Sequence, residues 1–147
     1  MSEILHRIAV DAPPAKVLPV VTTAQGLRTW WTDDCEAKPE VGAVLRFRFN
    51  GGTVEMPFRV DEISPSRVAW TCVSGPKLPP EWLGTKVEFD LQPRGSAGTD
   101  LRFAHSNWGS TSGGYPECNT TWGELMHRLK AAAEGHPRGA FFTSGKA

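Results

Sequence analysis

The sequence predicts an α+β fold with a curved six-stranded antiparallel sheet, two short helices, and a long C-terminal helix that covers the concave face of the sheet. Alternating apolar and polar residues mark six segments as strands. A sustained helical period of apolar residues occurs near the C-terminus. The length of 147 residues suits one domain, which would bury roughly 70% of the surface of its unfolded chain.

The N-terminal third is expected to form one strand and two short helices. Residues 4–10 alternate with the period of a strand. Pro13 and Pro14 suit the first turn of a helix whose apolar residues lie at positions 17, 20 and 21. Pro19 should kink or shorten that helix. A second helix is expected over residues 25–31, and the charged segment 33–42 is expected to be a loop.

Five further strands are expected to form a meander. Period-two alternation places them at residues 45–49, 54–60, 68–72, 87–91 and 101–105. Turn sequences at residues 50–52, 64–66 and 95–98 connect neighbouring strands, and a Gly- and Pro-rich loop spans residues 74–84. Pro57 cannot donate a ladder hydrogen bond, which predicts a sheet edge or a β-bulge there.

The long helix is expected to begin near Tyr115 and to end at Gly135. Its apolar stripe runs through Cys118, Trp122, Leu125, Leu129 and Ala132. Residues after it show no period. The predicted organisation is therefore one domain over residues 1–137, followed by a C-terminal tail over residues 138–147.

Composition excludes several classes of function. The 16 basic and 16 acidic residues give zero net charge, whereas a nucleic-acid-binding protein normally has a basic surface. The apolar runs are too short to span a membrane, and the N-terminus lacks the apolar region of a secretory signal. The three cysteines and four histidines lack metal-ligand spacing. We expect a cytoplasmic protein with reduced thiols and with neither metal nor cofactor.

The predicted layers leave a gap between helix and sheet. A helix is about 10 Å wide, whereas five or six strands spaced about 4.8 Å apart span more than twice that width. Bulky side chains, the short helices or a ligand must cover the remaining concave surface. The chain contains six Trp and seven Phe beside a single Tyr. These rings are expected either to fill a core or to line a cavity.

Strand parity and helix spacing select the residues that would line such a cavity. They are Trp30, Trp31, Phe47, Phe49, Met56, Phe58, Trp70, Phe89, Phe103, His105, Cys118, Asn119, Trp122 and Met126. For each apolar residue, the alternative is a place in an ordinary packed core.

His105 is the candidate catalytic residue. It has the inward parity of its strand, and a neutral imidazole can orient a ligand or act as a general base. The alternative is a structural histidine bonded to a backbone carbonyl. Asn119 is placed either toward the cavity or away from it. The acidic residues Asp33, Asp34 and Glu36 follow the tryptophan pair, either as a gate at the entrance or as a solvated loop.

Several strings in the same order resemble the START-like, helix-grip (SRPBCC) superfamily, and within it homologues of the ATPase-activating co-chaperone of heat-shock protein 90. The strings span residues 10–17, 27–32, 67–71 and 98–105, together with Asn119, Trp122, Leu125 and Leu129 on the last helix. Pro19 and Cys72 depart from the family pattern. The resemblance covers residues 3–135 and implies the helix-grip fold, which hosts lipid carriers, hormone receptors, cyclases and co-chaperone domains.

The leading hypothesis is a protein that binds a small apolar or aromatic molecule between the sheet and the long helix. One alternative is a cyclase- or hydrolase-like enzyme that uses His105 as a general base. Another is a co-chaperone-like domain that contacts a larger ATPase. The expected partners are thus a small molecule and, in the last case, a chaperone, but neither nucleic acid nor a membrane.

Overall fold

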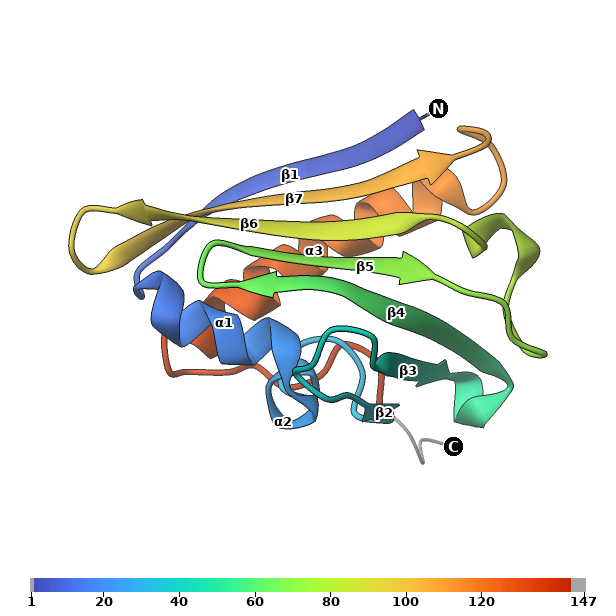
Figure 1. Ribbon diagram of the computed structural model, residues 1–147, viewed down its shortest axis with the longest axis horizontal. Coiled ribbons are helices and arrows are strands. Elements are labelled where there is room, and N and C mark those ends of the chain that lie inside the picture. Colours follow the sequence, from blue (N-terminus) through green and yellow to red (C-terminus); the bar gives the residue numbers. More distant parts are fainter. Residues whose placement is uncertain (1, 144–147) are drawn as a thin grey trace.

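The structure, a computed structural model, describes residues 2–143 (Figure 1). The sheet strands in this part of the chain are β1 (Ser2–Val10), β2 (Cys35–Glu36), β3 (Val44–Phe49), β4 (Val54–Ser64), β5 (Arg67–Cys72), β6 (Lys86–Arg94) and β7 (Gly98–Trp108). The helices are α1 (Pro14–Thr22), α2 (Ala24–Leu27) and α3 (Tyr115–Ala133), with 3-10 turns η1 (Asn50–Gly52) and η2 (Pro80–Trp82). The predicted α+β helix-grip fold is confirmed.

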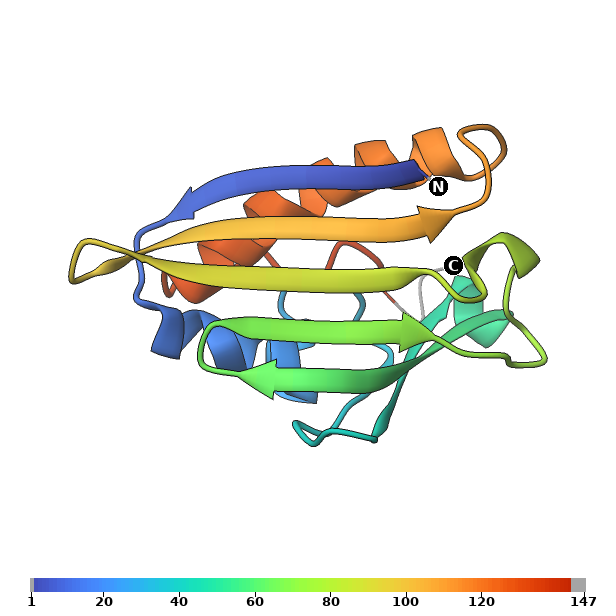
Figure 2. The same cartoon turned by 45° about the horizontal axis from the view of Figure 1, so that its top comes forward.

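The strands form one antiparallel sheet in the order β1-β7-β6-β5-β4-β3-β2. The first strand pairs with the last, so β1 adds to the meander beside β7 and becomes one edge of an open sheet, with β2 at the other edge. Helix α3 runs along one face of this sheet, as Figures 1 and 2 show. The inner face of the sheet and one side of α3 therefore pack together and form a common core.

The sheet has seven strands rather than the six that the sequence predicts. The additional strand β2 pairs Cys35 with Phe47 and Glu36 with Arg46. Two residues are too short a segment to show an alternating period, so nothing in the sequence marks β2 within the charged segment 33–42, which predicts a loop. The expected helix over residues 25–31 is also shorter, because α2 ends at Leu27 and turns follow it.

Pro57 lies inside the sheet, on β4, rather than on an edge strand. It faces Arg46 of β3, and its carbonyl accepts a hydrogen bond from the amide of Val73, just beyond the end of β5. The irregular register between β4 and β5 falls between Val60 and Glu62 instead. Pro57 would direct a backbone N–H toward the same side as its carbonyl. That side faces Val73, which follows the end of β5, so proline interrupts no hydrogen bond within β5 itself.

The two faces of the sheet differ in chemistry. Inward-facing aromatic and aliphatic side chains form the core, among them Phe47, Phe58, Trp70, Phe89 and Phe103, all at most 2% exposed. The outer face carries cross-strand ion pairs, including Arg7–Asp100, Arg46–Glu55 and Arg67–Glu88. Solvent screens such exposed pairs, so each contributes little to stability.

Side chains of α3 bond two carbonyls of the edge strand β1, one near each end of the strand. The hydroxyl of Tyr115 donates to the carbonyl of Glu3 at 2.6 Å, and the ammonium of Lys130 donates to the carbonyl of Ala9 at 2.9 Å. These bonds satisfy carbonyls that an edge strand would otherwise offer to another chain. No helix within residues 2–143 combines the length and apolar character needed to cross a membrane.

The segment expected to be a tail returns to the domain. The amides of Phe141 and Phe142 donate to the carbonyls of Trp30 and Trp31, and Phe142 forms an isolated parallel bridge with Thr32. Its ring packs against that of Phe49 with centroids 4.9 Å apart. Residues 1 and 144–147, which belong to the predicted domain and tail, lie outside the described residues.

Candidate functional site

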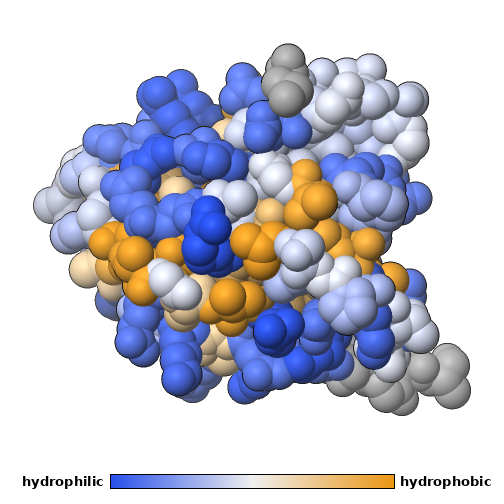
Figure 3. All heavy atoms as spheres, turned by 45° about the vertical axis from the view of Figure 1, so that its right-hand side comes forward, coloured by the Kyte–Doolittle hydropathy of each residue, from blue (hydrophilic) through white to orange (hydrophobic). Residues whose placement is uncertain are grey.

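A pocket of about 290 Å³ lies between the N-terminal half of α3 and the sheet, near the β3–β4 turn. It is lined by Trp31, Phe49, Asn50, Val54, Met56, Pro79, Glu81, Trp82, Gly114, Glu117, Cys118, Thr121, Trp122, Leu125 and Phe142. Figure 3 turns the end of the molecule that bears the β3–β4 turn toward the reader. Hydrophobic side chains form a band there, bordered by hydrophilic ones.

Helix spacing provides one wall of the pocket. Cys118, Thr121 and Leu125 follow one another at three- and four-residue steps, so they lie on the same face of α3. Trp122 lies beside them, with its ring 5.0 Å from that of Trp31. The polar groups of this wall are the hydroxyl of Thr121, the thiol of Cys118 and, in the first turn of α3, the carboxylate of Glu117.

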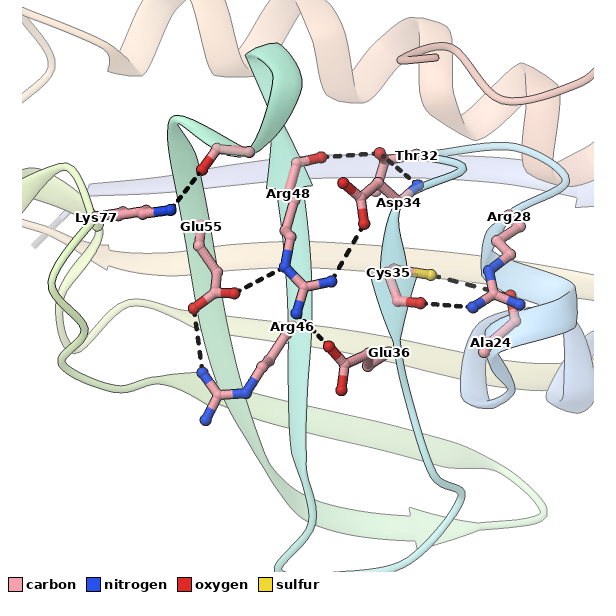
Figure 4. Close-up of polar contacts among 11 residues, drawn as sticks. Ala24, Arg28, Thr32, Asp34, Cys35, Glu36, Arg46, Arg48, Glu55 and Lys77 are labelled. Carbon is pink, nitrogen blue, oxygen red and sulfur yellow. Dashed lines mark hydrogen bonds and ion pairs between the residues drawn. The ribbon is translucent and has the colours of Figure 1, made fainter. Parts of the chain in front are cut away.

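The opposite wall comes from β3 and β4, where alternation decides which side chains face inward. Phe49 and Met56 point to the pocket, while Arg48 lies on the outer face. As Figure 4 shows, the guanidinium of Arg48 bonds Asp34 at 3.2 Å, Glu55 at 2.9 Å, and also Glu36. These bonds join three neighbouring segments of the chain and so hold the sheet edge that carries Phe49.

The loop that contains η2 forms the end of the pocket. The ring of Trp82 packs edge-on against Phe58 and Trp108, with centroid distances of 6.1 and 5.5 Å. The Glu81 carboxylate accepts a hydrogen bond from the amide of Gly114 at 2.8 Å, which links the loop to the start of α3. An irregular segment is thereby fixed at the pocket by ring packing on one side and by a charge-assisted bond on the other.

The structure divides the predicted site residues into two main groups. Five of them line the pocket, namely Trp31, Phe49, Met56, Cys118 and Trp122. The others of this set lie in the packed core away from the pocket, namely Trp30, Phe47, Phe58, Trp70, Phe89, Phe103, His105 and Met126. Most of the predicted central cavity is thus occupied by the rings themselves. Asn119 is exposed and lies outside the pocket lining.

His105 forms part of a buried hydrogen-bond chain. The indole N–H of Trp122 donates to Nδ1 at 3.0 Å, so Nδ1 is unprotonated and the neutral ring carries its proton on Nε2. Nε2 then donates to the hydroxyl of Thr85 at 2.9 Å, which donates to the carbonyl of Trp82 at 2.7 Å. Burial lowers the pKa of His105 to about 3.

This bonding leaves His105 without a lone pair for a substrate proton. A general base needs an accepting nitrogen within reach of the reacting group. Nδ1 already accepts from Trp122, and the ring lies outside the pocket lining. The geometry therefore gives no support to an enzyme that uses His105. The acidic residues proposed as a gate do not line the pocket either, and Asp34 and Glu36 bond Arg48 instead.

Sequence reasoning missed ten residues of the pocket lining. Thr121 and Leu125 share a helix face with Cys118, and Val54 shares strand parity with Met56, so their spacing could have identified them. The remaining residues come from the first turn of α3 and from segments without a period, namely turns, the loop that includes η2 and the C-terminal segment. They are Asn50, Pro79, Glu81, Trp82, Gly114, Glu117 and Phe142.

Comparison with known proteins places the chain in a family. The family model described as activator of Hsp90 ATPase homolog 1-like protein matches residues 11–134. The chain belongs to this family. Its fold is that of the START-like superfamily, to which the Hsp90 ATPase activator-like proteins are related.

Solved structures support the same assignment. The Aha1 dimer from Colwellia psychrerythraea is 38% identical, with a TM-score of 0.80, over 92% of this chain and 98% of that one. A Mesorhizobium loti protein is 19% identical, with a TM-score of 0.76, over 89% of this chain and 96% of that one. A Bacillus halodurans protein is 20% identical, with a TM-score of 0.71, over 91% of this chain and 98% of that one. The latter two show the fold alone. A search of curated proteins finds no match to this Aha1-like chain.

Proposed function

We propose that this Aha1-like protein binds a small apolar or aromatic molecule in the pocket between α3, the β3–β4 turn and η2. The observation that carries the proposal is a pocket of about 290 Å³ whose walls are largely aromatic and aliphatic. An apolar cavity of roughly 150 Å³ in another protein is enough to bind benzene. A molecule with one or two rings therefore fits the available space.

The rings around the pocket support the proposal further. Trp31, Trp82 and Trp122 line the pocket, and each is at most 7% exposed, so their positions are fixed by the surrounding core. Binding to pre-positioned side chains avoids the entropic cost of ordering them. The same three indoles provide a fluorescence signal for a bound aromatic molecule.

Replacing Thr121 with tryptophan should weaken binding of the neutral probe 1-naphthalenemethanol at least about tenfold, or 1.4 kcal/mol. The larger side chain would extend from α3 into the space that the probe needs. Quenching of tryptophan fluorescence during titration measures the affinity of each variant.

The matched control is Thr120→Trp, which adds the same ring one position away on the exposed side of α3. It should bind the probe as the wild type does. Equal affinity for the two variants would refute the pocket as the binding site, and so would a wild-type protein that does not bind the probe.

A second candidate function is stimulation of an Hsp90-type ATPase. It is favoured by the family model over residues 11–134 and by the 38% identical protein named Aha1. Adding this protein to a purified bacterial Hsp90 should raise the rate of ATP hydrolysis until the rate saturates. Heat-denatured protein is the control. An unchanged rate at saturating concentration would eliminate this candidate.

A further inference from the structure

The pocket has two carboxylates on its wall and no basic side chain among its lining residues. Glu81 comes from η2 and Glu117 from the first turn of α3. No lysine, arginine or histidine among residues 2–143 forms an ion pair with either carboxylate. The ammonium of Lys77, from the preceding loop, bonds the carbonyl of Gly52 at 3.0 Å and does not line the pocket.

The start of α3 offsets only part of this negative charge. Glu81 accepts from the amide of Gly114, and Glu117 lies where the helix dipole favours an acidic side chain. The dipole is equivalent to about half a positive charge at the N-terminus. Two carboxylates carry two negative charges, so this wall of the pocket keeps a net negative charge at neutral pH.

The thiol of Cys118 reports the same field inside the pocket. Burial raises the pKa of this thiol to about 12, and the charges of Glu117 and Glu81 contribute in the same direction. Carboxylates that disfavour a thiolate at this position would also disfavour an anionic ligand and favour a cation.

We infer that the pocket selects a cationic amphiphile, with an organic ammonium group on an apolar or aromatic body. The inference rests on the proposed function, since it requires that the pocket bind a small molecule. The body would lie against Trp31, Trp122 and Leu125, and the ammonium would face Glu81 and Glu117. Aromatic faces also attract cations, which adds to the preference.

Three probes with the same naphthalene body test this inference. They are 1-naphthylmethylammonium, the neutral 1-naphthalenemethanol and the anionic 1-naphthoate, each titrated by calorimetry at low ionic strength. The ammonium probe should bind about tenfold tighter than the alcohol, and the carboxylate should bind more weakly than the alcohol. Added salt should narrow these differences because it screens charges near the pocket mouth.

The double variant Glu81→Gln, Glu117→Gln should bring the affinity of the ammonium probe close to that of the alcohol. Glutamine keeps an oxygen that accepts the Gly114 amide hydrogen. The matched control is Glu124→Gln, which removes a carboxylate paired with Arg128 elsewhere on α3 and away from the pocket. It should leave the preference for the ammonium probe unchanged.

The outcomes separate this inference from the proposed function. If the alcohol binds and the charged probes bind equally well, or the carboxylate binds best, the charge selection is refuted while the proposed function stands. If the two Gln replacements leave the ammonium preference intact, Glu81 and Glu117 are not its source and the inference fails. If none of the three probes binds, both the proposed function and the inference fail.

Discussion

Replacing Gly26 with alanine is expected to destabilise the protein by about 3 kcal/mol or more, since the new methyl group has no room. A Cβ built at Gly26 would lie 2.3 Å from the carbonyl oxygen of Pro19 and 2.6 Å from the Cα of Val20. Both atoms belong to the backbone of α1, so the two helices would have to separate. Urea unfolding followed by far-UV circular dichroism measures the loss.

The separation would also displace the tryptophan pair that follows α2. The indole N–H of Trp30 donates to the carbonyl of Val20 at 3.0 Å, and Trp31 lines the pocket. The free energy of unfolding and the affinity for the naphthalene probes should therefore fall together. A binding loss in folded protein at low denaturant would show that the pocket depends on the contact between α1 and α2.

Gly123→Ala is the matched control, because it makes the same substitution in the interior of α3. Its Cβ would lie 3.6 Å from Cε1 of His6, an ordinary van der Waals distance. Alanine favours a helix over glycine by roughly 0.8–1 kcal/mol, so this variant should be more stable than the wild type. Similar stability changes for Gly26→Ala and Gly123→Ala would contradict the packing argument.

The sequence identifies the layers of the fold because each layer has its own period. Leu45, Phe47 and Phe49 alternate with arginines, and the structure places them on a strand of the predicted type. The stripe from Cys118 to Leu129 lies on α3, as predicted. A short element contains too few residues for its period to be recognised. This explains why the sequence does not predict the two-residue strand β2 and why it predicts a helix that continues beyond Leu27, where α2 ends.

The pocket is harder to predict from the sequence, because its position depends on how completely the side chains fill the core. Alternation places Phe47, Trp70 and Phe89 on the inner face, but it does not give the space that their rings occupy. In the structure Phe47 and Trp70 pack with centroids 5.6 Å apart, and Trp70 and Phe89 with centroids 5.4 Å apart. The pocket lies where Phe142 and Trp82 arrive from segments without a period.

The buried hydrogen bonds of His105 are expected to make stability depend strongly on pH. The pKa of a histidine in the unfolded chain is near 6.5, and burial lowers that of His105 to about 3. Between these values the unfolded chain binds a proton that the folded protein excludes. The free energy of unfolding should therefore fall as pH falls, by about 1.4 kcal/mol per pH unit for this one group.

Comparing the wild type with His105→Gln isolates that contribution. The glutamine amide keeps one donor and one acceptor for Thr85 and Trp122 but does not titrate. Between pH 7 and pH 4 the wild type should lose about 3 kcal/mol more than this variant, in urea unfolding at each pH. The control His127→Gln removes an exposed histidine and should follow the wild type.

Nitrogen chemical shifts provide a direct test of the same hydrogen-bond chain. With Trp122 donating to Nδ1, the ring of His105 should remain the neutral Nε2–H tautomer at all pH values where the protein is folded. A His105 ring that titrates near pH 6.5 in the folded protein would contradict the chain from Trp122 through Thr85 to Trp82. A neutral ring together with a steep loss of stability below pH 6.5 would establish His105 as a structural residue of the core, rather than a base at the pocket.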